Sequence, residues 1–526
     1  MKAAPAAQPL FTFGQCLKQI LKTRKLSASA LSRMMEQKSR NSMFRILDDT
    51  GGPAVQAAFF ESLKASDCLH LTEQEERELE RALEVSRFGV AGYMTNQAMH
   101  RLLGDVDLQA AADDSLRVDR SRDGSVTTLR ESMERLAAEQ KRVHFVITGC
   151  CYRRVLERIA AAFAGSACEM SIEHYLYTGG DEIIGCVSAI QPVLYLPDYK
   201  GYCIDENMFN IQREQVYRCN TITAHCEDAQ GQKQVLMAVM IDPQRLLSIG
   251  SPDERNIEIV ERMMREDRPK MHPIKREFQT SGSPEGYLAY TKSLQRLEQG
   301  RSIYDIKLDV PINFVAPEVL VGPARDGFAA HGFAQDDALE EMIGQFYKVH
   351  QKRFDNYFQK RRPTHAIFSR QAMEQFAQTG LESDHFFAIR PFSPAERVSI
   401  LTHLKEQNET NPNFCLYFFK PGYRQPRTEI CLYEGAGTML TVADTDYDLS
   451  GAHSEVLITQ TEFSRKYKAF FIHDLLESKV LSPAETQKTF EDLIEIARNA
   501  STRAALRSFL YKKISRRQEK LRLIRL

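Results

Sequence analysis

The stretch SASALSRMMEQKSRNSMFRILDD, residues 27–49, decides how the N-terminal part of the chain folds. Its apolar residues recur every three or four positions, which predicts two short amphipathic helices over residues 27–36 and 39–48 with a tight turn between them. GlyGlyPro at residues 51–53 ends the second helix. Two short helices joined in this way are typical of a helix-turn-helix.

The second helix of this pair has a polar outer edge at its start. Leu31 and Met35 are expected to pack the first helix inwards, and Met43 or Ile46 to hold the second. The outward side chains suit DNA, because Arg pairs with guanine, Asn with adenine, and Lys or Ser with phosphate. The predicted DNA-binding residues are Lys38, Ser39, Arg40, Asn41, Ser42 and Arg45.

The charge of the N-terminal segment agrees with this prediction. Residues 1–64 hold ten Lys or Arg against four Asp or Glu, whereas the whole chain of 526 residues has a net charge of −1. A local positive patch supplies the salt-dependent, sequence-independent part of DNA affinity. Attraction to nucleic acid is therefore expected from this segment and not from the molecule as a whole.

On these residues, the segment 11–66 resembles the N-terminal domain of lambda-repressor-like regulators, the Xre family. The matching runs are ArgLysLeuSerAlaSerAlaLeuSerArgMetMet (24–35) and LysSerArgAsnSerMetPheArgIleLeu (38–47). The resemblance implies a helix-turn-helix domain that binds double-stranded DNA. Because such domains usually read two half-sites about one DNA turn apart, it also implies a homodimer.

The remainder of the chain predicts several domains, about three or four for this length. The expected fold class is an all-α N-terminal helix-turn-helix bundle followed by a large α+β, or mixed α/β, C-terminal region. The expected parts are a disordered leader (1–10), the helical DNA-binding domain (11–103), a linker (104–128), an α/β sensor subdomain (129–310) and an α+β subdomain with a basic terminal helix (311–526).

Individual elements of the C-terminal region follow from hydrophobic pattern and capping signals. Ser-Pro-x-Glu, which opens a helix by capping its free amides, occurs at Ser251, Ser393 and Ser482. Further helices are expected over residues 129–141, 151–164 and 337–357. Strands are expected at 143–149, 191–196, 235–241, 365–369, 415–419, 429–433 and 438–442. We find no repeat of fixed period.

Motifs that invite a chemical interpretation have simpler explanations. GlyGlyAspGlu at 179–182 resembles the diguanylate cyclase signature, but Ile183 stands where that family has Phe, and a turn accounts for it equally well. Cys150-Cys151, and Cys219 with His225-Cys226, lack the two close ligand pairs of a structural zinc site. No catalytic residue, metal or cofactor is therefore expected.

The C-terminal end, residues 503–525, has the residue pattern of a basic amphipathic helix and is predicted to form one. We expect a solvated surface helix or a packing arm, and extra contact with a DNA backbone is the alternative. The eleven cysteines are scattered and odd in number, which favours reduced thiols in the cytoplasm. No run of about 18 apolar residues is present, so a membrane span is not expected.

Together these features predict a one-component transcriptional regulator that is not an enzyme. Its N-terminal helix-turn-helix would read an operator, and its C-terminal region would sense a small-molecule or protein effector or oligomerise. Two alternatives stay open. One is an enzyme of unknown reaction in the C-terminal α/β region, and the other is a protein–protein interaction scaffold.

Overall fold

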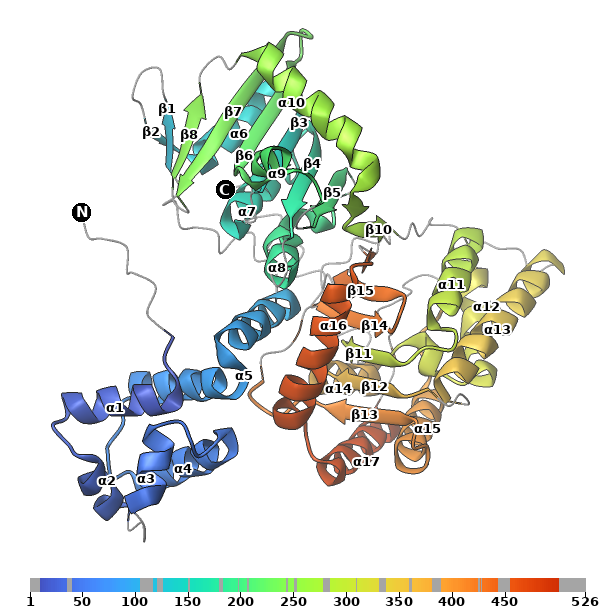
Figure 1. Ribbon diagram of the computed structural model, residues 1–526. Coiled ribbons are helices and arrows are strands. Elements are labelled where there is room, and N and C mark those ends of the chain that lie inside the picture. The colour runs from blue at the N-terminus through green and yellow to red at the C-terminus, as the bar shows by residue number, and fades with distance from the viewer. Residues whose placement is uncertain are drawn as a thin grey trace. The chain divides into compact units, whose positions relative to one another are not determined.

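The chain divides into two compact units, Met1–Ala98 and Met99–Leu526 (Figure 1). The computed structural model describes residues 10–35, 40–104, 117–120, 126–149, 152–178, 183–196, 198–205, 208–242, 245–249, 253–277, 284–308, 310–330, 337–358, 362–380, 389–423, 426, 428–442 and 455–500.

The first unit consists, over its described residues, of helices. They are α1 (Phe13–Thr23), α2 (Ala28–Met34), α3 (Arg40–Leu47), α4 (Pro53–Ser66) and α5 (Glu73–Leu103), which continues into the second unit. The predicted helix pair is confirmed as α2 and α3. Leu31, Met43 and Ile46 are buried in the core of this unit, as the pattern requires.

Helix α5 is interrupted at Gly89. The backbone there has φ 71° and ψ 168°, a conformation outside the helical region that glycine adopts without a steric penalty. The residue pattern predicts one helix that runs from the capping residues Thr72 and Glu75 towards Arg87, and another over residues 95–103. Thr72 and Glu75 do form a capping box at the start. The two predicted helices are therefore the two halves of one bent element.

The second unit contains two mixed sheets, so the chain is a mixed α/β protein. The first sheet has the order β2-β1-β8-β7-β6-β3-β4-β5-β9. Its strands are β1 (Arg117–Arg120), β2 (Val126–Thr128), β3 (Gln140–Thr148), β4 (Glu169–Tyr177), β5 (Tyr199–Ile204), β6 (Thr221–Asp228), β7 (Lys233–Asp242), β8 (Arg245–Ile249) and β9 (His272–Pro273). Its helices are α6 (Leu129–Glu139), α7 (Arg153–Phe163), α8 (Ile183–Leu194), α9 (Ile211–Arg218), α10 (Glu254–Asp267) and the short η2 (Arg268–Lys270).

The second sheet has the order β10-β16-β15-β14-β11-β12-β13. Its strands are β10 (Lys275–Glu277), β11 (Ile303–Lys307), β12 (Thr364–Phe368), β13 (Phe414–Phe418), β14 (Thr428–Tyr433), β15 (Gly437–Val442) and β16 (Glu455–Ile458). Its helices are α11 (Pro284–Glu298), η3 (Ile312–Phe314), α12 (Pro317–Ala330), α13 (Asp337–Phe358), α14 (Arg370–Thr379), α15 (Pro394–Thr410), α16 (Thr461–Phe470), the π-helix η4 (Phe471–Lys479) and α17 (Pro483–Asn499).

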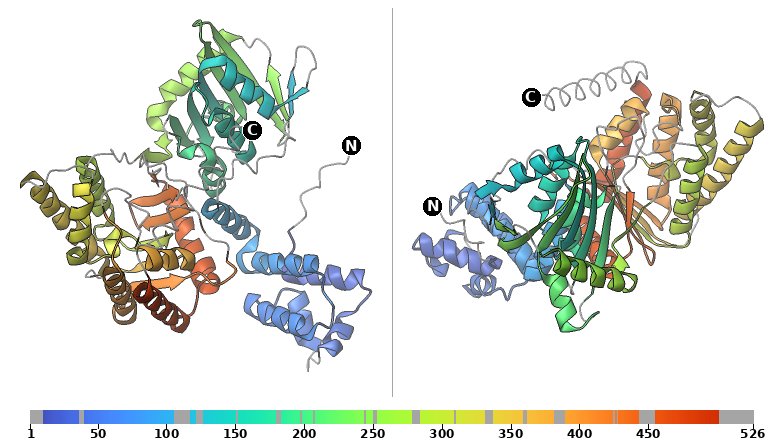
Figure 2. Two further views of the ribbon diagram at one scale, coloured as in Figure 1. Left: turned by 180° about the vertical axis from the view of Figure 1, so that it is seen from behind. Right: turned by 90° about the horizontal axis from the view of Figure 1, so that it is seen from above.

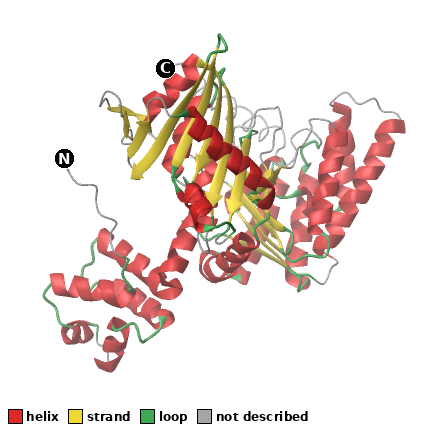
Figure 3. Ribbon diagram, turned by 45° about the horizontal axis from the view of Figure 1, so that its top comes forward, coloured by secondary structure: helices red, strands yellow, loops and turns green. Residues whose placement is uncertain are grey.

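Six strands of each sheet, β3–β8 and β11–β16, share one topology. In the first, β3, β4 and β5 are parallel, and β6, β7 and β8 follow antiparallel on the other side of β3. In the second, β11, β12 and β13 are parallel, and β14, β15 and β16 follow antiparallel beside β11. A long helix comes after each set, α10 after β8 and α16 after β16. The strand order therefore recurs although the sequence shows no repeat of fixed period. Figures 2 and 3 show the strands of each sheet side by side with helices on their faces.

Alternation along β3 separates a core face from a polar face. Val143, Phe145 and Ile147 are fully buried on one side, where the Phe145 ring meets Phe163 of α7. Since successive side chains of a strand point to opposite faces, His144 and its alternate neighbours lie on the other side, towards α10. This second face carries the polar groups.

Several predicted elements differ from the structure. Residues 191–196, predicted as a strand, lie largely in α8, whose described side chains are all buried. A short apolar run has no periodicity that distinguishes a buried helix from a buried strand, and this prediction is wrong for that reason. Strands β1 and β2 lie inside 104–128, the segment predicted as a linker. The second sheet begins with β10, well before residue 311.

Candidate active site

A groove of about 150 Å³ opens on the polar face of the first sheet, beside α10. Three neighbouring strands and one helix supply its walls. The lining residues are His144 and Val146 of β3, Glu173 and Tyr175 of β4, His225 of β6, and Glu261, Met264 and Arg265 of α10. The groove thus brings together side chains from four elements that are far apart in the sequence.

Two histidines lie side by side in this groove. His144 and His225 are directly paired residues of the antiparallel strands β3 and β6, and their ring centroids are 6.1 Å apart. Both are half-buried. Paired positions of adjacent strands project to the same face, so the sheet register itself holds the two imidazoles together.

The surroundings of His144 favour its neutral form. Its Nδ1 lies 2.8 Å from Oγ of Ser171, and among the described residues nothing hydrogen-bonds to its Nε2. Burial lowers the pKa of His144 below its ordinary value, although the charge of Glu173 opposes this effect. When Nδ1 carries the proton and donates it to Ser171, Nε2 is available as a base.

The surroundings of His225 are different, because a carboxylate lies against it. Nε2 of His225 is 2.6 Å from Oε1 of Glu261, which is 15% exposed. A carboxylate in this position fixes the tautomer and orientation of the imidazole and stabilises an imidazolium when it forms. The two histidines of the groove are therefore in unlike environments, as an acid and a base require.

Guanidinium groups border the groove. Arg265 is 54% exposed and lies 3.9 Å from Glu261. Arg268 of η2 forms an ion pair with Glu173 and donates a hydrogen bond of 3.1 Å to the hydroxyl of Tyr175. Burial raises the pKa of this tyrosine, which keeps its hydroxyl protonated. Planar guanidinium groups at the edge of a pocket suit carboxylate or phosphate groups.

The predicted DNA-binding residues lie elsewhere, in the first unit. Asn41, Ser42 and Arg45 are exposed on α3. Arg40 begins this helix, but its side chain lies outside the described residues, as do Lys38 and Ser39. Their role stays a prediction.

The acidic residues that follow α3 have a structural role. Asp49 accepts hydrogen bonds from the hydroxyl of Thr12 and, at 2.9 Å, from the amide of Gly14. It also accepts a bond of 2.7 Å from the amide of Gln56. Asp49 thereby joins the start of α1 to the end of α3 and to α4.

Most of the other motifs of the sequence fall on residues that the structure does not describe. GlyGlyAspGlu, Cys150-Cys151 and residues 503–525 lie outside the described residues. His225 and Cys226 are consecutive in β6, so their side chains point to opposite faces, and Cys226 is buried. Over the described part of the chain, no group of three or more His, Cys, Asp or Glu side chains is arranged to hold a metal ion.

The groove was not predicted from the sequence, although β3 and β6, which supply its two histidines, each show a pattern of polar residues. In β3, His144 and Thr148 alternate with Val143, Phe145 and Ile147, and in β6 the polar residues Thr221, Thr223 and His225 also fall on every second position. This alternation marks a polar face on each strand. Nothing in the sequence shows that the two faces adjoin, because that depends on the pairing of β3 with β6.

Comparisons with known proteins give little guidance. No family model matches the chain, and no curated protein matches it. Among solved structures, a match is the phosphatidylserine synthase of Haemophilus influenzae Rd KW20, with 10% identity over 70% of this chain and 91% of that one, at a TM-score of 0.23. The described part of the chain contains no helix long and apolar enough to cross a membrane.

The prediction of a one-component transcriptional regulator is not borne out: the matched structure is named as that of a synthase and not of a DNA-binding protein. The alternative of an enzyme in the C-terminal α/β region stays a prediction. A TM-score of 0.23 is too low to show a common fold, so no reaction or substrate is carried over from that synthase. The groove has to be judged on its own geometry.

Proposed function

We propose that the second unit is an enzyme that cleaves phosphoric esters, with the groove as its active centre. The observation that carries this proposal is the pair His144 and His225, held at 6.1 Å by strand pairing and given unlike environments by Ser171 and Glu261. Two titratable groups that lie side by side with different hydrogen-bond partners are suited to act as base and acid.

The roles follow from the hydrogen bonds. Nε2 of His144 takes a proton from an attacking water, whose oxygen bonds to phosphorus. The ester P–O bond breaks, and the departing oxygen receives the proton on Nδ1 of His225, whose Nε2–H is held by Glu261. Both histidines then return to their starting states by exchange with solvent.

Two guanidinium groups offer contacts to an anionic substrate, and each also has a carboxylate neighbour, Glu261 for Arg265 and Glu173 for Arg268. Arg265 belongs to α10 and Arg268 to η2. The side chain of Arg265 is 54% exposed, so it can reorient towards a substrate. Guanidinium groups stabilise the charge that develops on phosphoryl oxygens in the transition state. The volume of the groove, about 150 Å³, admits a phosphoryl group with part of its alcohol.

A panel of chromogenic esters tests the reaction class. The full-length protein is incubated with p-nitrophenyl phosphate, bis(p-nitrophenyl) phosphate and p-nitrophenyl acetate, and release of p-nitrophenolate is followed. We expect turnover of at least one phosphate ester and none of the acetate beyond the rate without protein. Turnover of the acetate alone, or of no ester, would show that the proposed reaction class is wrong.

A further inference from the structure

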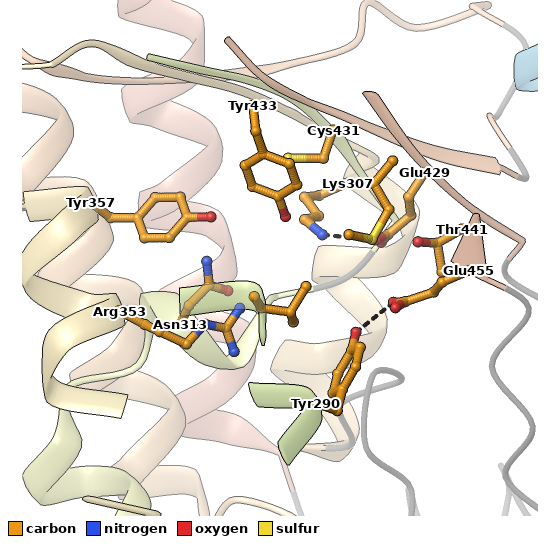
Figure 4. Close-up of a pocket in the computed structure, with 12 residues that line it drawn as sticks. Tyr290, Lys307, Asn313, Arg353, Tyr357, Glu429, Cys431, Tyr433, Thr441 and Glu455 are labelled. Atoms are coloured by element: carbon orange, nitrogen blue, oxygen red, sulfur yellow. Dashed lines mark hydrogen bonds and ion pairs between the residues drawn. The ribbon is translucent and has the colours of Figure 1, made fainter. Parts of the chain in front are cut away.

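A cavity at the second sheet is much smaller than the groove of the first sheet. It has a volume of about 30 Å³ and is lined mainly by polar side chains, among them Arg353, Glu429 and Glu455 (Figure 4). This volume corresponds to about two water molecules, which is too little for a substrate. The groove, of about 150 Å³, is large enough for chemistry, and one of its charged side chains, Glu173 of β4, takes no part in the proposed proton transfers.

Glu173 lies on the same face of the sheet as the proposed base, His144. In the parallel strands β3 and β4, His144 is paired with Ser171, and Glu173 follows Ser171 by two residues, so its side chain projects to the same side. The strand spacing of about 4.8 Å and the rise of about 3.3 Å per residue place the Cα atoms of His144 and Glu173 on the order of 8 Å apart. Both residues line the groove.

The charge of Glu173 acts directly on His144. Burial lowers the pKa of His144, and Glu173 opposes this effect more strongly than Glu261 does. The other charged groups around this imidazole, His225 of β6 and Lys200 of β5, lower its pKa further. Because electrostatic effects weaken with distance, Glu173 is the carboxylate nearest to the base in its effect.

The partners of Glu173 leave one side of its carboxylate open. One oxygen pairs with Nη2 of Arg268, and the hydroxyl of Tyr175 hydrogen-bonds to the same carboxylate. Tyr175 lies two residues further along β4, away from His144, and Arg268 also donates to its hydroxyl. A carboxylate has about four lone-pair positions, and the side chain of Glu173 is 14% exposed. Towards His144 it can therefore accept another donor.

A water molecule between the two groups can donate to both. It has two O–H bonds, one for Nε2 of His144 and one for Glu173, whereas an alcohol has only one. Two hydrogen bonds through one oxygen span up to roughly 5–6 Å, a distance that side chains on neighbouring strands can present. We infer that Glu173 binds the attacking water and makes the centre a hydrolase that discriminates against alcohols. This inference rests on the proposed function.

The two O–H bonds of the water have different fates. The proton held by His144 passes to its Nε2 as the water oxygen bonds to phosphorus, and the ester P–O bond breaks towards His225. The proton held by Glu173 stays on that oxygen and becomes a hydroxyl of the product. An alcohol in the same place would direct its carbon chain at the carboxylate, which would lose its hydration without gaining a donor.

Competition between water and methanol tests the inference. The full-length protein turns over a phosphate ester of the chromogenic panel in buffer that contains methanol, and ³¹P NMR measures the ratio of methanolysis to hydrolysis products. We expect the unchanged protein to favour water beyond the molar ratio of the two nucleophiles. In Glu173→Ala the methanol share should rise by roughly tenfold, the effect of one hydrogen bond to a charged group.

The pH–rate profile of Glu173→Ala is a second readout. The charge of Glu173 raises the pKa of His144 against the effect of burial, so its removal lowers that pKa. Since a base must be deprotonated to act, the acidic side of the profile should move to lower pH. A merely structural loss would reduce turnover without moving this side of the profile or changing the product ratio.

Two further variants are controls. Glu169 lies on the same strand and pairs with Arg142 at 2.8 Å, but its side chain is 64% exposed, so Glu169→Ala should leave turnover and product ratio unchanged. Arg268→Gln breaks the ion pair and keeps the carboxylate, so the product ratio should stay that of the unchanged protein. An equal rise of the methanol share in Arg268→Gln and Glu173→Ala would overturn the inference.

The unchanged protein alone also decides the matter. A product ratio equal to the molar ratio of methanol to water would overturn the inference without any variant, and so would an unchanged ratio in Glu173→Ala. Absence of turnover would remove the proposed function and this inference with it. Turnover with an unselective product ratio would remove the inference alone.

Discussion

Glu261 of α10 holds His225 of β6 through a contact of 2.6 Å between Oε1 and Nε2. The two residues are 36 positions apart. His225 thus lies against a carboxylate, whereas His144 lies against the hydroxyl of Ser171. This asymmetry distinguishes the proposed acid from the proposed base.

Glu261→Gln is expected to lower ester turnover by roughly 10- to 100-fold, the usual cost of removing a residue that orients a catalytic imidazole. The amide still accepts a hydrogen bond but no longer stabilises the imidazolium, so the basic side of the pH–rate profile, where the acid His225 loses its proton, should move to lower pH. The measurement is turnover against pH. Glu258→Gln on the exposed side of α10 is the control. An unchanged profile in Glu261→Gln would rule out the positioning role.

The buried pair of Glu298 and Arg353 predicts a large effect on stability. Burial by itself lowers the pKa of Arg353, but the charge and the hydrogen bonds of Glu298, together with Tyr357 and Tyr433, outweigh burial and raise the pKa well above its ordinary value. Glu298→Gln leaves a buried guanidinium without its counter-charge, which costs about 3–5 kcal/mol. Urea unfolding followed by circular dichroism measures the loss.

The exposed pair of Glu340 and Arg325 is the control for that experiment. Glu340→Gln is expected to change the free energy of unfolding by less than about 1 kcal/mol, since exposed pairs contribute little. Similar losses in the free energy of unfolding for Glu298→Gln and Glu340→Gln would contradict the expectation that the buried pair contributes more to stability than the exposed pair.

His350 predicts a dependence of stability on pH. It is fully buried against the carbonyl of Val315, at 2.8 Å from Nε2, and burial together with the charge of Arg353 lowers its pKa from 6.5 to about 3. As the pH falls below 6.5 the unfolded chain takes up a proton that the folded chain does not. Stability is therefore lost, by roughly 2 kcal/mol at pH 5.

His350→Gln removes this titration. The free energy of unfolding of the variant should depend less on pH between 5 and 8 than that of the unchanged protein, whatever its absolute stability. His473→Gln, at a histidine whose side chain is 61% exposed, should keep the original dependence. If the free energy of unfolding depends on pH in the same way in the unchanged protein and in His350→Gln, His350 does not titrate as its burial requires.

Local signals in the sequence were sufficient for many elements. The Ser-Pro-x-Glu boxes at Ser393 and Ser482 are both formed, with each serine accepting from the glutamate amide three residues on. Strands with strong patterns are confirmed as β3, β7, β12, β13, β14 and β15. Such features depend on residues close in sequence, which is why they can be predicted from it.

Long-range features were not predictable in the same way. His144 and His225 are 81 positions apart, and their pairing depends on which strand lies beside β3. The shared topology of the two sheets likewise consists of strand order, which no local pattern encodes. The cavity beside Arg353 arises from helices and strands that meet only in the folded chain.

The central claim is that His144 and His225 together form an acid–base centre, and the most direct test is phosphate-ester turnover in His144→Gln and His225→Gln. His272→Gln, at a histidine of the same sheet whose side chain is 65% exposed, serves as the control. Each groove variant is expected to lose at least 100-fold in turnover while keeping the melting temperature of the control. Turnover that persists in both groove variants at the level of His272→Gln would contradict it.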